Sequence, residues 1–226
     1  MAMARQGAHV AINCLQHTDL AEKVALEVRM LGRQSIVVQA DVTIRLQVQK
    51  MVDSVIKKWG SLDVLVTNVG HAYYHRIEAI EPKQWYQTID ENLTSQMYCI
   101  QAVLPYMVKQ GSGRVIAISS ISAQRGSPSG DIGYSACKAG VIAMIKTLAN
   151  QYASQQIGLN IVLPGIIDAG LTNSMSLERR SQMIENIPMR RLGKPDEIGE
   201  VVAFLASDRA SYITGQAIAV NGGLYM

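Results

Sequence analysis

The chain alternates between short, continuous apolar runs and longer segments in which apolar residues recur with helical spacing. Apolar runs of about four to eight residues bounded by turn residues are typical of strands buried on both faces. Apolar positions three and four residues apart indicate amphipathic helices. From these patterns we expect strands at 10–13, 35–40, 64–67, 115–119, 159–163 and 217–220.

Helical spacing occupies the segments between these strands. We expect helices at 19–31, 45–59, 83–106, 134–155, 177–186 and 196–206, the third of them interrupted near Asn92. Gly32 and Gly60 are suited to end helices, and Pro195 is suited to a first helical turn. Because strands and helices alternate without a linker or repeat, we predict one α/β domain over residues 1–226, built on a doubly wound parallel sheet.

Composition narrows the class of protein further. A chain of 226 residues with 48% hydrophobic and 17% charged residues can bury a substantial core, which excludes a disordered protein. The net charge of +3, without a Lys/Arg cluster interleaved with aromatics, argues against a nucleic-acid partner. No apolar run reaches the roughly 18 residues of a membrane span. Cys14, Cys99 and Cys137 fit neither a disulfide framework nor a zinc spacing, which favours a reducing, cytoplasmic setting.

Tyr134 and Lys138 stand four residues apart within the helix expected at 134–155. This spacing puts both side chains on one face, so an ammonium lies beside a phenol. A neighbouring cation favours the phenolate, and we therefore expect the pKa of Tyr134 to lie below its ordinary value of about 10. Such a phenol can give and take a proton near neutral pH, as carbonyl–alcohol redox chemistry requires. Two surface residues on a helix would show the same spacing, so the surrounding motifs decide between the two interpretations.

Those motifs follow in a fixed order along the chain. Asn92 interrupts a helix, and Ser120 ends an apolar strand fourteen residues before Tyr134. This set resembles the catalytic set of the short-chain dehydrogenase/reductase family in its single-domain form. The resemblance covers essentially the whole chain, and it also rests on Asp41-Val42, 67–70, Pro164-Gly165, 211–216 and 220–223. It implies a Rossmann-like fold and hydride transfer between a nicotinamide cofactor and a carbonyl or alcohol substrate.

The resemblance also implies roles for the catalytic residues. Tyr134 would be the general acid and base, and Ser120 would hydrogen-bond the substrate carbonyl, with Ser119 and Ser122 close enough to compete for that assignment. Lys138 would lower the pKa of Tyr134 and hold the ribose of the nicotinamide. Asn92 would pass protons through water to Lys138, although a simple helix kink would explain the same residue.

Cofactor contacts follow from the same resemblance. We expect them at Asn13, Asp41, Val42, Asn68, Gly70, Tyr134, Lys138, Pro164, Gly165 and Ile167. Asp41 could also cap the following helix, and both roles can hold at once. The end of the second strand reads Asn13-Cys14-Leu15, without the carboxylate that binds the 2′-hydroxyl of NAD. NADP(H) is therefore favoured over NAD(H).

One expected part is missing from the front of this pattern. A dinucleotide-binding fold opens with a strand and a Gly-rich turn at a helix N-terminus, whereas this chain opens on a helix end at Gly7 followed by the second strand. The absent strand would occupy the middle of the sheet. We therefore expect an N-terminally truncated domain, and three explanations stay open: a misassigned start, a splice or truncation product, or a sheet that closes over the gap.

The substrate and partners remain less defined. Segments 191–198 and 211–226 are similar to bacterial 3-oxoacyl-carrier-protein reductases, and Arg114 matches a basic position near their carrier protein, but Gln155 replaces a second one. Sugar, steroid and xenobiotic carbonyl reductases share the core motifs. His71 and His75 are expected to line the substrate mouth rather than bind a metal. The resemblance implies a homotetramer through 93–109, 134–155 and the C-terminal segment, and the missing turn leaves a non-catalytic relative as the alternative function.

Overall fold

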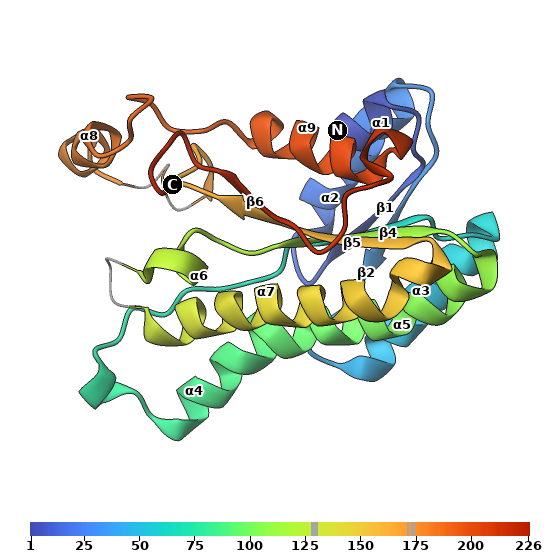
Figure 1. Ribbon diagram of the computed structural model, residues 1–226. Coiled ribbons are helices and arrows are strands. Elements are labelled where there is room, and N and C mark those ends of the chain that lie inside the picture. The colour runs from blue at the N-terminus through green and yellow to red at the C-terminus, as the bar shows by residue number, and fades with distance from the viewer. Residues whose placement is uncertain (128–130, 171, 173–174) are drawn as a thin grey trace.

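The structure, a computed structural model, describes residues 1–127, 131–170, 172 and 175–226. Within them it shows an α/β fold with parallel strands and helices on both sides (Figure 1). The strands are β1 (Val10–Cys14), β2 (Ser35–Gln39), β3 (Val64–Thr67), β4 (Gly113–Ile118), β5 (Ile157–Pro164) and β6 (Ala217–Val220). The predicted strands are therefore all present, with ends that differ by two residues or fewer.

Helices connect the strands in the predicted order. They are α1 (Ala2–Arg5), α2 (Thr18–Met30), α3 (Arg45–Trp59), α4 (Pro82–Ile89), α5 (Ser95–Gln110), α6 (Ser122–Arg125), α7 (Ile132–Tyr152), α8 (Leu177–Glu185) and α9 (Pro195–Ala206). The expected interruption near Asn92 is a π-helical turn, Asp90–Thr94, between α4 and α5. Helix α6 was not predicted, because one turn is too short to show a helical period.

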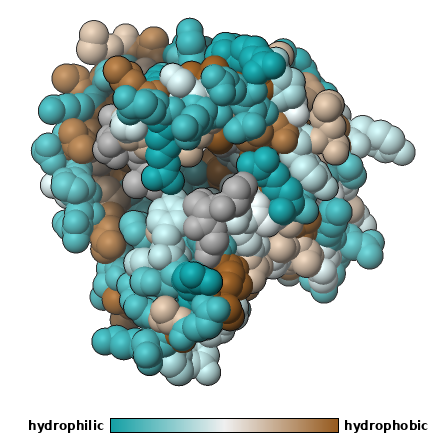
Figure 2. All heavy atoms as spheres, turned by 90° about the vertical axis from the view of Figure 1, so that its left-hand side faces the viewer, coloured by the Kyte–Doolittle hydropathy of each residue, from teal (hydrophilic) through white to brown (hydrophobic). Residues whose placement is uncertain are grey.

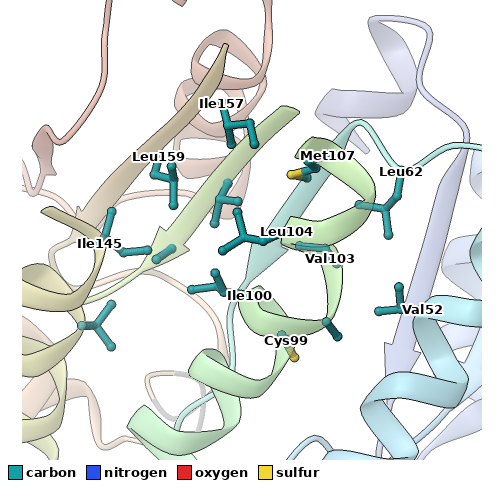
Figure 3. Packing of buried hydrophobic residues seen from close by; sticks show 14 of the residues in the cluster. Val52, Leu62, Cys99, Ile100, Val103, Leu104, Met107, Ile145, Ile157 and Leu159 are labelled. Atoms are coloured by element: carbon teal, nitrogen blue, oxygen red, sulfur yellow. The ribbon is translucent and has the colours of Figure 1, made fainter. Parts of the chain in front are cut away.

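The core lies mainly between the strands and the helices α3, α5 and α7. Buried residues of β4 and β5 meet apolar residues of α5 and α7 there, and Figure 3 shows Ile145 near Leu159 and Ile100 near Leu104. Helix α9 covers the opposite face, where Val202 and Leu205 pack against Ile116 and Val162. Burial on both faces explains why β4 and β5 read as unbroken apolar runs.

The strands form two separate sheets rather than one. Strand β1 pairs with β2, and β3, β4, β5 and β6 form the second sheet in that order. A sheet closed over the gap was one of the three explanations, but no backbone ladder joins β1 to β3 among the described residues. Between them lies a cleft of about 880 Å³, lined by both strands and by residues of α3 and α5. We call this space the interstrand cleft.

Helix α7 and the turn after it, Ile132–Gln155, are long and apolar enough by composition to cross a membrane. Its side chains Val141, Ile145 and Ala149 are buried in the main core, where the helix packs on β5. Long apolar helices of this kind also occur as core helices of folded domains. We therefore assign α7 to the core.

Candidate active site

The predicted catalytic residues meet where the parallel strands β3, β4 and β5 end. Asn68 follows β3, Ser120 follows β4, and Gly165 follows β5. Helix α7 begins beside them and contributes Tyr134 and Lys138. The carboxyl edge of a parallel sheet is the usual position for ligands in this architecture. The topology thus brings together segments that lie up to about 100 residues apart in the chain.

Lys138 is the buried centre of this group, with 3% of its surface exposed. Its Nζ donates hydrogen bonds to the carbonyl oxygens of Val69 at 3.0 Å and Ile118 at 3.1 Å. Burial lowers the pKa of Lys138 to about 8, because an ammonium loses hydration there. An ammonium has three donors, so one N–H remains beyond the two backbone bonds for a hydroxyl group such as that of a ribose.

Tyr134 lies in the first turn of α7, where Asp131 caps the helix by accepting a hydrogen bond from the Tyr134 amide at 2.8 Å. The expectation that its pKa is lowered was wrong. Burial raises the pKa of Tyr134, although a hydrogen bond from the Ser120 hydroxyl acts in the opposite direction. Lys138 Nζ is 5.5 Å from the centre of the Tyr134 ring and donates to the two backbone carbonyl oxygens named above.

The three neighbouring serines have different partners. Ser119 is buried, and its hydroxyl donates to the carbonyl oxygen of Lys138 at 2.8 Å. The Ser120 hydroxyl accepts a hydrogen bond from the Ser122 amide at 3.1 Å and is bonded to Tyr134. Ser119 therefore fixes α7 against β4, and Ser120 is the serine that faces the phenol.

Asn92 is fully buried in the π-helical turn and holds the loop after β3. Its Oδ1 accepts from the His71 amide at 3.0 Å, and its Nδ2 donates to the carbonyl oxygens of His71 at 2.9 Å and Thr88 at 3.0 Å. A π-helical turn leaves carbonyl groups without their ordinary helical partners. Gln96 Nε2 donates to the Asn92 carbonyl oxygen, and the Ser95 hydroxyl donates to that of Glu91.

Gly70 lies where this asparagine and the lysine converge. A methyl group on its Cα would come within 2.6 Å of Asn92 Oδ1 and 2.8 Å of Lys138 Nζ. Only a glycine therefore permits the loop after β3 to approach both side chains. The close approach links Asn92 and Lys138 through a single backbone segment.

The residues expected at the adenine end lie on the other side of the interstrand cleft. Asp41 Oδ1 accepts from the Thr43 amide at 2.9 Å and from its hydroxyl at 2.6 Å, in a turn that leads into α3, and Val42 is buried. Asn13 Nδ2 donates to the carbonyl oxygens of Val38 and Ala40, so its amide ties β1 to the end of β2.

The residues expected at the nicotinamide end follow β5. The Gly165 amide donates to the Val220 carbonyl oxygen at 3.0 Å, and a methyl group on Gly165 would come within 2.7 Å of the Asn221 Cα. Ile167 forms a parallel bridge with Gly193. A pocket of about 300 Å³ lies beside Ile166 and Ile167. Its lining also includes Arg191 and Glu197 but none of the predicted catalytic residues.

One polar cluster beside the site was missed by sequence analysis. The Tyr73 hydroxyl donates to the Glu91 carboxylate at 2.9 Å, and Gln87 Nε2 donates to Tyr73 Oη at 2.9 Å and to Glu91 at 2.8 Å. The His71 ring contacts that of Tyr73 at a tilt of 53°, with ring centres 4.6 Å apart. The cluster joins a loop to a helix, and no periodic pattern in the sequence signals such a pairing.

Figure 2 looks onto the end of the molecule where α6 and α8 lie. It shows a hollow with apolar surface inside a mostly hydrophilic rim. His71 is exposed and His75 is partly buried. Among the described residues no group of three or more His, Cys, Asp or Glu side chains could hold a metal ion.

Comparison with known proteins identifies the family to which this fold and these residues belong. The profile of a family described as enoyl-(acyl carrier protein) reductase matches residues 1–225. The 3-oxoacyl-[acyl-carrier-protein] reductase FabG of Staphylococcus epidermidis is 42% identical over 226 residues, which are 100% of this chain and 92% of that protein. A 3-oxoacyl-[acyl-carrier-protein] reductase of Synechocystis sp. is 37% identical over 227 residues, covering 100% of this chain and 90% of that protein.

Comparison with a solved structure points to the same class of protein. The crystal structure of a putative short-chain alcohol dehydrogenase from Sinorhizobium meliloti 1021 matches with a TM-score of 0.93 and 30% identity, over 99% of this chain and 88% of that chain. The fold is thus that of a nicotinamide-type α/β oxidoreductase. The chain belongs to the short-chain dehydrogenase/reductase family, as its motifs predicted.

Proposed function

We propose that this protein reduces a 3-oxoacyl thioester, or a related carbonyl compound, to the alcohol with NADPH. The observation that carries the proposal is the linked group of Ser120, Tyr134, Lys138 and Asn92 at the carboxyl edge of the sheet. The bound nicotinamide supplies the hydride, or accepts it in the reverse direction.

Tyr134 is the proton donor in this proposal. The phenol is protonated at neutral pH and can give its proton to the substrate oxygen, although its raised pKa makes it a weaker acid than a free phenol. The Ser120 hydroxyl lies against the phenol and orients the same oxygen. The remaining donor of Lys138 holds a ribose hydroxyl, and the Asn92 side chain keeps the loop after β3 in place around both groups.

The substrate class is supported by the curated relatives, two of which carry the name 3-oxoacyl-[acyl-carrier-protein] reductase. Contact with a carrier protein through Arg114 gains no support from the geometry. Arg114 Nη1 donates to the carbonyl oxygens of Gly113 at 3.0 Å and Gln156 at 3.2 Å, at the end of β4 opposite to Ser120. We therefore propose that the protein recognises the acyl thioester itself rather than a carrier protein.

The test measures the rate of NADPH oxidation with two substrates. Acetoacetyl-CoA serves as the 3-oxoacyl thioester, and cyclohexanone serves as a simple ketone for comparison. Tyr134→Phe should lower kcat by about 10²- to 10⁴-fold, because the proton donor is lost. Tyr152→Phe, at the far end of the same helix, is the matched control and should retain activity. Full activity of the Tyr134→Phe variant would overturn the assignment of the donor. Equal rates on both substrates would overturn the thioester preference.

Preference for NADP(H) rests on the end of β1, where Asn13, Cys14 and Leu15 provide no carboxylate to repel a 2′-phosphate. The ratio of kcat/KM for NADPH and NADH measures this preference. Introducing a carboxylate with Leu15→Asp should shift the ratio toward NADH. An unchanged ratio would place the selecting group elsewhere.

The homotetramer is proposed from the outer faces of α5 and α7, which lie side by side in Figure 1. Large apolar side chains are exposed there, among them Met97, Val108 and Ile132. Apolar side chains exposed on neighbouring helices would be covered if these faces met in an assembly. Light scattering should give the mass of four chains, and a monomer would contradict the assembly. The three cysteines are free, which suits a reducing, cytoplasmic compartment.

A further inference from the structure

The loop that follows β3 carries a concentration of ring side chains. Four of the five residues at 71–75 are histidine or tyrosine, in a chain where Phe, Trp and Tyr together make up 5% of residues. Figure 1 shows this part of the chain running from β3 toward the end of the molecule where α6 and α8 lie. We call residues 71–75 the aromatic loop.

The aromatic loop leaves directly from the proposed catalytic group. Just before it, the Val69 carbonyl oxygen accepts from Lys138 Nζ at 3.0 Å. The amide and carbonyl groups of His71 are both bonded to the Asn92 side chain. A methyl group on Gly70 would collide with Asn92 and with Lys138. The loop therefore begins in contact with two of the residues that we assign to the reaction.

Tyr73 is anchored to the protein, and this anchor fixes the position of the residue after it. The Tyr73 hydroxyl donates to the Glu91 carboxylate at 2.9 Å, and Gln87 Nε2 donates to Tyr73 Oη at 2.9 Å. The His71 ring contacts the Tyr73 ring, with ring centres 4.6 Å apart. The protein itself therefore occupies both the hydroxyl and the ring of Tyr73.

Tyr74 differs from Tyr73, because its ring remains open to solvent. The His75 amide donates to the Tyr73 carbonyl oxygen at 3.1 Å, which closes a three-residue turn with Tyr74 at its tip. The side chain of Tyr74 is 54% exposed, and among the described residues its ring contacts no other ring. Burial is the main cause of the raised pKa of Tyr134, and the nearby charges of Asp131 and Tyr74 raise it further. An exposed ring thus stands close to the proposed proton donor.

We propose that Tyr74 contacts the substrate and selects carbonyl compounds that carry a flat aromatic ring next to the reacting carbonyl. The inference rests on the proposed function, which places the reaction at Tyr134. Because Tyr134 donates to the carbonyl oxygen, a ring that reaches Tyr74 lies close to that carbonyl. Two aromatic rings prefer offset-stacked or edge-to-face contacts, and such a pair adds binding energy beyond the area that it buries. A tyrosine held at the tip of a short turn also loses little freedom when a ring packs on it.

A saturated acyl chain is the competing ligand, since two curated relatives are named as reductases of 3-oxoacyl groups. Such a chain would also cover the Tyr74 ring, but only by apolar contact, which depends on the buried area rather than on a flat ligand face. A saturated ring of the same size as a phenyl ring therefore separates the two cases.

The test compares two 3-oxoacyl thioesters that differ in the ring beside the carbonyl, 3-oxo-3-phenylpropanoyl-CoA and its cyclohexyl counterpart. Their dissociation constants are measured by isothermal titration calorimetry in the presence of NADP⁺, which cannot reduce the ketone. The phenyl compound should bind about three- to tenfold more tightly than the cyclohexyl compound. Equal affinities, or no binding of either compound, would overturn the proposal.

Substitutions at Tyr74 locate the preference. Tyr74→Leu should bring the ratio of the two dissociation constants close to one, whereas Tyr74→Phe keeps the ring and should retain the ratio. Tyr212→Leu is the matched control, because it removes a fully exposed tyrosine just before β6, at the opposite edge of the sheet. A ratio that persists in Tyr74→Leu would overturn the proposal. Should Tyr74→Leu fail to fold by circular dichroism, Tyr74→Ser gives the same comparison.

Tyr73 is expected to act through Tyr74 as a positioning residue. Tyr73→Phe removes the hydrogen bond to Glu91, so the ratio should fall while the affinity for the cyclohexyl compound changes less. An unchanged ratio would overturn this positioning role. NADPH oxidation is followed separately with both thioesters. Tighter binding of the phenyl compound without any oxidation of NADPH would contradict the proposed function and support the ring preference, whereas oxidation with equal affinities would do the opposite.

Discussion

The four-stranded sheet and the two-stranded sheet differ in how completely they are covered. In β5 the residues Leu159, Ile161, Val162 and Leu163 are fully buried between helices on both faces. In β1 exposed and partly buried residues alternate, although the strand is equally apolar in sequence. The proposed catalytic side chains thus lie at the four-stranded sheet, which is more completely covered by helices. The residues expected to hold the adenine lie on the less-covered part.

The difference shows that apolar character alone does not produce burial. A parallel strand becomes buried when it has a neighbour on each side and helices over both faces. Strand β5 has β4 and β6 as neighbours, whereas β1 has only β2. Two strands alone are marginally stable, so β1 and β2 depend on their packing against α2 and α3.

The largest expected contrast is in core stability. Ile161→Ala in β5 should lower the free energy of unfolding by about 2–5 kcal/mol, because it leaves a cavity in a close-packed core. Ile36→Ala in β2, a partly buried position, is the matched substitution and should cost about 1 kcal/mol. Urea unfolding followed by circular dichroism measures both. Equal losses would show that the two sheets share one core.

The second largest effect is expected for Asn92→Ala, which should reduce turnover. The substitution leaves the His71 amide and the carbonyl oxygens of His71 and Thr88 without their partners inside the protein. Leaving such groups unpaired costs about 1–3 kcal/mol each, and the displaced loop should lower kcat by about 10²-fold. Steady-state kinetics with acetoacetyl-CoA measures this. Asn13→Ala, in the two-stranded sheet, should raise the KM for NADPH more than it lowers kcat.

The alkaline limb of the pH profile should report Lys138. Its pKa is lowered to about 8 by burial, so its charge is lost as pH rises through about 8, and kcat/KM should fall there. The unfolded chain keeps this proton up to about pH 10.4, so between these values the unfolded state binds more protons. This residue therefore adds stability as pH rises while activity falls. Loss of activity together with loss of circular dichroism signal would contradict the assignment to Lys138.

The smallest effect is expected at an exposed ion pair. Arg191 and the Lys194 amide lower the pKa of Glu197 to about 2, by hydrogen bonds at the start of α9. Glu197→Gln should lower the melting temperature slightly at pH 7. The stabilisation is present above the ordinary pKa of the carboxyl and is lost as pH falls toward about 2, so the difference between the proteins should vanish there. A difference that persists at low pH would exclude the ion pair as its cause.

Much of the fold could be predicted from local patterns. The helix at 45–59 and the strand at 64–67 were located to the residue, because Gly60 ends the helix with a φ of +78° and the apolar run after it is short. The family motifs also placed Ser120, Tyr134 and Lys138 in one site. Their shared position follows from the rule that parallel strands end at the same edge.

The remaining features depend on three-dimensional surroundings that the sequence does not display. The pKa of Tyr134 is raised because burial outweighs its polar neighbours. The link between Tyr73 and Glu91 joins side chains eighteen residues apart across a loop. The π-helical turn at Asp90–Thr94 could be expected as an interruption, but its hydrogen bonds from Ser95 and Gln96 could not.

Lys138 joins the end of β3 to the end of β4 through the carbonyl oxygens of Val69 and Ile118. The ammonium proposed to hold the cofactor ribose therefore also has a structural role. Replacing this lysine in a search for activity at high pH would also remove the bonds between the segment that follows β3 and the end of β4, where the backbone ladder of the two strands has ended.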